Sequence, residues 1–96
     1  MRTPRISPEE AELIALKALG FLATEPERLS RFLALSGVDL GDIRQAAQNP
    51  DFLAGLLNHL LQDESLLLTF TAEQEIDPRL PALAAEALAR AEGDSF

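Results

Sequence analysis

Apolar residues recur at helical spacing along most of this chain, and prolines preceded by capping residues separate the apolar segments. Proline is favoured at the first position of a helix, because its missing N–H would have no partner there. A Ser, Thr, Asn or Asp just before it supplies a capping oxygen, and the acids that follow face the positive end of the helix dipole. This phrase occurs at Pro8, Pro26 and Pro50, and in a weaker form at Pro78. The pattern therefore predicts several short helices.

The first predicted helix starts at Pro8, where Ser7 and Glu10 have the spacing of a capping box. Its apolar face is wide, so we expect neighbours on two sides. Gly20 lies inside this helix, at a cost of about 1 kcal/mol relative to alanine. We interpret it as a point of close approach by another backbone, and a bend in the helix is the alternative. The apolar residues are Ala11, Leu13, Ile14, Ala15, Leu16, Ala18, Leu19, Phe21 and Leu22.

The next stretch predicts two helices joined by a glycine turn. The first starts at Pro26, with Thr24 as its capping residue, and ends at Gly37, where glycine suits the left-handed residue that closes a helix. Asp39 is predicted to cap the second, which runs to about Gln48.

From Pro50 onward, leucines form one clear helical stripe, which would place Glu64 in the core if it continued. We therefore predict a break, with Asp63 capping a separate helix that runs to about Gln74. A single helix over residues 50–74 is the alternative. The helix that Asp63 caps has four large apolar residues within five positions, and no single face holds all of them. We therefore expect this helix to be buried nearly all round. The four residues are Leu66, Leu67, Leu68 and Phe70.

The last helix is expected to start near Leu80, because Pro81 follows Pro78 too closely for a regular helix to begin earlier, and to end at Gly93. The predicted fold is all-α, an irregular, orthogonal-type bundle of five to six short helices around a single core. Residues 1–6 are expected to form a flexible basic tail, residues 7–92 one helical domain, and residues 93–96 a C-terminal tail.

Composition narrows the possible functions. The chain has 96 residues and no cysteine, which indicates one domain and excludes disulfides, thiolate nucleophiles and cysteine metal sites. No apolar segment follows the basic N-terminus, and no apolar run reaches the ~18 residues of a membrane span. We therefore expect a soluble, cytoplasmic protein with no membrane partner.

Charge is distributed unevenly. The net charge is −8, and no Lys or Arg occurs between Arg44 and Arg79. That acidic stretch, which includes Asp63 and Glu64, is interpreted as a solvated surface or as a docking face for a basic partner.

Residues that could carry out catalysis are sparse. His59 is the single histidine and is predicted to lie on the polar side of its helix, with Asp63 one turn further on. Two ligands fall short of a metal site, and neither a nucleophile elbow nor a glycine-rich phosphate loop is present. We therefore expect no catalytic activity, no cofactor, no metal and no small-molecule ligand.

One alternative is a degenerate helix-turn-helix centred on the turn at Gly37. Its second helix would open with Asp39 and Asp42, which would oppose DNA phosphates, so nucleic-acid binding is disfavoured. In the other interpretation, the nearby arginines pair locally with Glu27 and Asp42. These arginines are Arg28, Arg31 and Arg44.

Several strings resemble a small proteobacterial family of unknown function, the domain-of-unknown-function family numbered 3572. The resemblance runs from about Ser7 to Ala91 and implies a bacterial, cytosolic, stand-alone helical domain. It implies no activity, ligand or catalytic residue. The strings are Ala18-Leu19-Gly20-Phe21-Leu22-Ala23, Pro26-Glu27-Arg28-Leu29, Arg31-Phe32-Leu33 and Leu60-x-x-Asp63-Glu64 with Phe70.

By elimination, we expect a protein-interaction or regulatory module without catalytic activity, which binds a protein partner or a second copy of itself. Self-association through the alanine-rich last helix is one specific hypothesis. The residues predicted to form the interaction surface are Arg28, Arg31, Arg44, Asp63 and Glu64.

Overall fold

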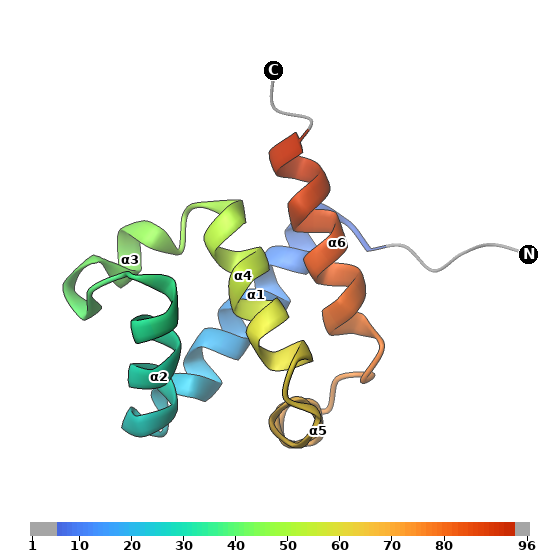
Figure 1. Ribbon diagram of the computed structural model, residues 1–96. Helices are drawn as coiled ribbons and strands as arrows, with labels where there is room; N and C mark the ends of the chain where they lie inside the picture. The colour runs from blue at the N-terminus through green and yellow to red at the C-terminus, as the bar shows by residue number, and fades with distance from the viewer. Residues whose placement is uncertain (1–5, 94–96) are drawn as a thin grey trace, which may run out of the picture.

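The computed structural model describes residues 6–93, in which all regular elements are helices (Figure 1). This confirms the all-α prediction. The first half of the chain forms α1 (Pro8–Ala23), α2 (Pro26–Ser36), the short 3₁₀ helix η1 (Leu40–Asp42) and α3 (Ile43–Ala46). The second half forms α4 (Pro50–Leu61), α5 (Glu64–Glu73) and α6 (Leu80–Gly93). No helix in this range combines the length and the apolar character needed to cross a bilayer.

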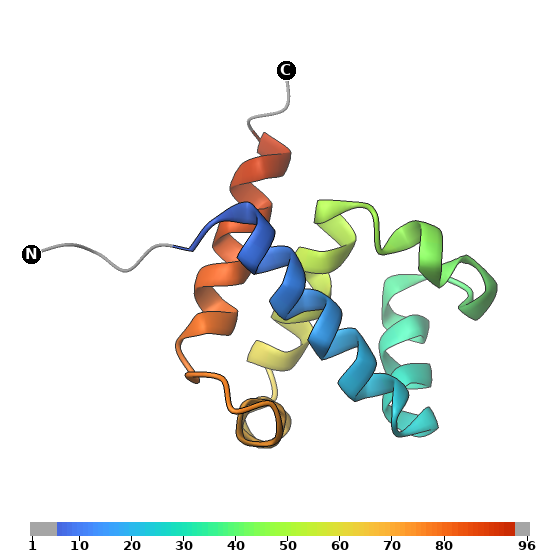
Figure 2. The ribbon, with the colours of Figure 1, turned by 180° about the vertical axis from the view of Figure 1, so that it is seen from behind.

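The core lies where α1, α4 and α6 meet. These three helices make the most extensive contacts in the molecule, and Figure 2 shows α1 crossing both of the others. Alanines on α1 and α6 let the helices approach closely, while α4 supplies leucines. The buried apolar residues of these helices include Ala11, Ile14, Ala15, Ala18, Phe21, Leu22, Leu53, Ala54, Leu56, Leu57, Leu60, Ala84, Ala85 and Leu88.

The inner alanines of α6 are thus already used within the chain. Ala84 and Ala85 are buried in the core, so a second copy would have to contact the outer side of this helix. Self-association itself stays a prediction.

The outer helices bury much less. Phe32 is the buried residue of α2, whereas η1 and α3 have none. Phe70, on α5, packs against Phe21 of α1, with ring centroids 5.4 Å apart. The expectation that this helix is buried all round is wrong, because Leu68 is 47% exposed. The reason is the position of α5 at one end of α4 and α6, where one side of it stays open (Figure 1).

Several helix ends match the prediction. The Glu10 N–H donates to Ser7 Oγ at 3.1 Å, and the Ser7 N–H donates to Glu10 Oε1 at 3.3 Å, which completes the capping box. Asn49 caps α4, and Gly37 closes α2 with a φ of 76°. The break before α5 is confirmed too, since Asp63 Oδ1 accepts the Leu66 N–H at 3.1 Å.

Three local predictions are wrong. α2 starts at Pro26 as predicted, but Glu25 and not Thr24 takes the cap position, and the Thr24 hydroxyl donates back to the Phe21 carbonyl at 2.6 Å. Asp39 makes no capping bond, and the predicted helix after it is divided into η1 and α3. No heavy atom lies within 4 Å of a Cβ built on Gly20, so no backbone approaches it, and α1 runs through this position without interruption.

Most of the two predicted tails, residues 1–5 and 94–96, lies outside the residues that the structure describes. Ile6, which the sequence places in the N-terminal tail, is partly buried against the core. At the other end, Leu80 begins α6 as expected, after a turn in which Asp77 accepts the Arg79 N–H at 2.9 Å.

Candidate functional site

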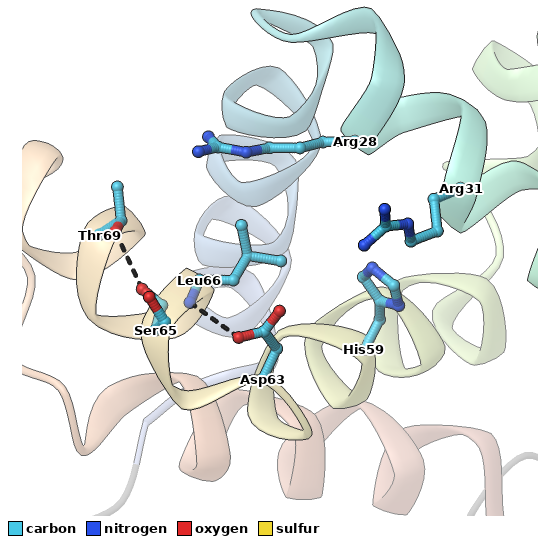
Figure 3. Close-up of a pocket in the computed structure, with 7 residues that line it drawn as sticks. All are labelled: Arg28, Arg31, His59, Asp63, Ser65, Leu66 and Thr69. Atoms are coloured by element: carbon cyan, nitrogen blue, oxygen red, sulfur yellow. Dashed lines mark hydrogen bonds between the residues drawn. The ribbon is translucent and has the colours of Figure 1, made fainter.

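A cleft of about 210 Å³ opens between α2, α4 and α5 (Figure 3). The chain brings three elements together here because α5 turns away from α4 at Asp63 and leaves room opposite α2. Arginines reach into the cleft from α2, and polar side chains line the opposite wall. The lining residues are Arg28, Arg31, His59, Asp63, Ser65, Leu66 and Thr69.

Arg28 is held in place at one edge of the cleft. Its Cζ atom lies 5.1 Å from the centroid of the Phe21 ring, a cation–π contact with a buried residue of α1. Its Nη2 also lies 3.4 Å from Glu25 Oε2, one turn earlier. The guanidinium is therefore fixed by two groups before any partner arrives. The pairing expected with Glu27 is wrong, since Glu25 takes that place.

Arg31 lines the same cleft as His59, and in the view of Figure 3 its guanidinium is drawn above the imidazole. It forms no ion pair with any residue in the range 6–90, and neither does Asp42, which was expected to pair with a nearby arginine. An exposed guanidinium without a carboxylate partner is available to bind an anion.

His59 is half-buried at the junction of α2 and α4. Its ring packs against Phe32, with centroids 5.2 Å apart. Burial lowers the pKa of His59 below its usual 6.5, and the Arg31 charge lowers it further, while Asp63 acts in the opposite direction. The imidazole is therefore neutral at neutral pH, so the positive charge of the cleft comes from the arginines.

Hydroxyl and carboxylate groups form the wall opposite the arginines. Asp63 uses Oδ1 to cap α5, as described above. The Thr69 hydroxyl donates to the Ser65 carbonyl at 2.9 Å, whereas the Ser65 hydroxyl makes no hydrogen bond within the described part of the chain. Ser65, His59 and Asp63 share the cleft, but no hydrogen bond joins them, so they do not form a nucleophile–base pair.

A second, more apolar groove adjoins the cleft. It has a volume of about 320 Å³ and runs between α2 and α4, with His59 shared by both hollows. Leu35 stands at its rim and is 73% exposed. The lining residues are Phe32, Leu35, Ser36, Gly55, Asn58, His59 and Gln62.

The five residues predicted as an interaction surface are only partly brought together. Arg28, Arg31 and Asp63 line one cleft. Arg44 lies on α3 and lines a separate hollow of about 530 Å³ beside α1. Glu64 is the exposed first residue of α5 and does not line the cleft.

His59 is the residue that the sequence analysis missed, because it assigned this side chain to a polar helix face. Its spacing from Asp63 was visible in the sequence, but the contact with Phe32 depends on how α2 docks on α4.

The helix-turn-helix alternative rests on elements of very different size. Its second half consists of η1 and α3, of 3 and 4 residues, and Arg44 is exposed on α3. Nucleic-acid binding stays an untested alternative. Among the side chains of residues 6–90, no three His, Asp or Glu groups gather closely enough to hold a metal ion.

Comparison with known proteins gives one match. The family described as "Protein of unknown function (DUF3572)" matches residues 8–91, which covers every helix of the structure except the last residues of α6. No curated protein and no solved structure matches the chain. The family match confirms the resemblance carried by the strings in α1, α2 and α4–α5. The chain belongs to the DUF3572 family of proteins of unknown function.

Proposed function

We propose that this protein is a protein-interaction module without catalytic activity, and that the cleft between α2, α4 and α5 is its contact surface. One observation supports this above all. Arg28, Arg31 and Asp63 converge on a single concave surface, where Arg31 has no ion-pair partner among residues 6–90.

The chemical character of the surface supports binding rather than catalysis. Arginine is enriched at the energetic centres of protein interfaces, where its guanidinium forms directed hydrogen bonds and stacks on apolar groups. The exposed Leu35 lines the adjoining groove and the half-buried Leu66 lines the cleft, so apolar area lies beside the charged groups. A polar cleft beside apolar area resembles the mixed composition of interfaces between proteins that also exist apart.

The proposal can be tested by affinity capture with a matched pair of charge reversals. Wild-type protein, Arg31→Glu and Arg44→Glu would be used as baits, with circular dichroism to show that all three are folded. We expect to capture proteins that still bind the Arg44→Glu variant but no longer bind the Arg31→Glu variant. The reason is that Arg31 lines the cleft, whereas Arg44 lines the separate hollow beside α1. The proposal for this surface would be contradicted if both variants lost the captured proteins equally, or if both retained them.

A further inference from the structure

We infer that the cleft and the adjoining groove together bind an acidic–apolar segment of a protein partner. A carboxylate of the segment sits between Arg28 and Arg31, and an apolar side chain next to it packs on Phe32 and Leu35. This inference rests on the proposed function and names the chemistry of the partner.

The carboxylate position follows from the two arginines. Arg28 is pre-positioned by Phe21 and Glu25, so little conformational entropy is lost when it binds. Arg31 reaches into the same cleft and has no partner among the residues the structure describes. Guanidinium groups bind carboxylates through paired, charge-assisted hydrogen bonds. The free Ser65 hydroxyl on the opposite wall offers a further donor.

The apolar position follows from the groove between α2 and α4. Phe32 forms part of its wall, and Leu35 is 73% exposed at its rim. Gly55 lines the groove from α4, and a Cβ built there meets no heavy atom within 4 Å. The space over Gly55 is therefore open to a side chain from outside. Since His59 lines both hollows, one short segment can reach both.

Charge favours a single carboxylate over a phosphate or a nucleic acid. Asp63 lines the cleft and Glu25 pairs with Arg28 at its edge, and the chain carries a net charge of −8. These negative charges oppose a doubly charged phosphate or a polyanion more strongly than one carboxylate. Two guanidiniums are enough to bind one carboxylate.

Fluorescein-labelled peptides test the two parts of the inference separately. The probe is a Gly/Ser peptide with one Glu-Leu pair at its centre, and matched peptides carry Gln-Leu or Glu-Ala. We expect each matched peptide to bind about tenfold more weakly in fluorescence polarisation, because each loses either the ionic hydrogen bonds or the apolar contact. Nitrogen–proton spectra of the protein locate the site through shifts at α2 and the start of α5.

Protein variants assign these contacts to residues. Arg31→Gln is expected to weaken binding of the Glu-Leu peptide about tenfold while leaving the Gln-Leu peptide unchanged. Gly55→Leu is expected to fill the groove and remove the preference for Leu over Ala. Arg44→Gln, in the separate hollow beside α1, is the matched control and should bind all peptides as the wild type does.

Asp63→Asn supplies a test in which the expected result is tighter binding, which damage to the structure would not produce. Asparagine preserves the cap of α5 and removes a negative charge from the cleft, so the Glu-Leu peptide should bind more tightly. Unchanged or weaker binding by this variant would overturn the inference. So would equal binding of the Glu-Leu and Gln-Leu peptides, or tighter binding of inorganic phosphate or of a DNA oligonucleotide through Arg31.

These results can be distinguished from failure of the proposed function. If no peptide binds but affinity capture still depends on Arg31, the interaction function stands and the acidic–apolar chemistry is wrong. If the peptides bind as expected but capture does not depend on Arg31, the inferred site exists, and the proposed contact with a protein partner is wrong.

Discussion

The inner helices α1, α4 and α6 and the outer helices α2, α3 and α5 divide the molecule into two regions of different character. The inner region contains nearly all of the buried apolar residues. The outer region contributes few buried side chains and, together with η1, carries three exposed leucines, namely Leu35, Leu40 and Leu68. The candidate cleft lies where the two regions meet.

This difference separates stability from recognition. Burial of apolar surface is the main favourable contribution to folding, so the inner region should hold most of the stability. The outer helices pack on the inner region and leave charged groups and apolar area exposed to solvent. Variants that act on one region and spare the other can therefore test the division.

The largest effect is expected from a core truncation. Leu57 is fully buried on α4, so Leu57→Ala should lower the free energy of unfolding by about 2–5 kcal/mol through lost burial and a residual cavity. Leu35→Ala, on exposed α2, should change it by less than about 0.5 kcal/mol. Urea unfolding followed by circular dichroism measures both. Similar losses for the two variants would refute the division into two regions.

Two glycines should respond with opposite signs. Gly37 closes α2 with a φ of 76°, where a Cβ is strained, so Gly37→Ala should cost about 1–2 kcal/mol. Gly20 lies inside α1 with open space around it, so Gly20→Ala should add about 0.5–1 kcal/mol through better helix propensity. The midpoints of urea unfolding show whether each variant is more or less stable than the wild type. A loss of stability with Gly20→Ala would mean that another group does approach α1 there.

A somewhat smaller effect is expected at the start of α5. Asp63→Ala removes the oxygen that accepts the Leu66 N–H and should cost about 1 kcal/mol, whereas Asp63→Asn should retain most of the stability. Hydrogen exchange of the α5 amides, compared with those of α4, shows whether the loss is local to the outer helix. Equal loss with alanine and asparagine would show that the charge, and not the cap, is what matters.

The smallest expected effect depends on pH and concerns the junction of the two regions. Burial lowers the pKa of His59, so the unfolded chain binds its proton more readily than the folded chain. The contribution to stability is therefore fully present above the usual pKa of 6.5 and is lost as the pH falls through the lowered value. Unfolding free energies of wild type and His59→Gln, measured from about pH 8 to about pH 5, should converge as the pH falls. If the unfolding free energies of the two proteins differed by the same amount at every pH, His59 would not be the source of the pH dependence.

Local signals in the sequence were sufficient for several helix starts. The capping box at Ser7, the cap at Asn49 and the break at Asp63 each depend on residues within one turn of each other, so the sequence pattern specifies them directly. Thr24 shows the limit of such signals. It lies one residue too far from Pro26, and its hydroxyl bonds back to α1 instead of forward to α2.

The candidate site could be predicted only in part, for a related reason. Arg28, Arg31 and Asp63 stood out by their charge, but nothing in the sequence indicated that they share a cleft from which Arg44 and Glu64 are absent. That grouping depends on the docking of α2 and α5 on α4, which side chains far apart in the sequence determine.

Local patterns along the chain specify the helical class, the positions at which most helices begin, and the core stripes of α1 and α4. Each of these depends on periodicity and capping within a few residues of the chain. Three features do not follow from such local patterns: α5 stays open on one side, His59 packs on Phe32, and the charged cleft adjoins an apolar groove. These features arise from contacts between helices, and the surface available to a partner is what those contacts leave uncovered.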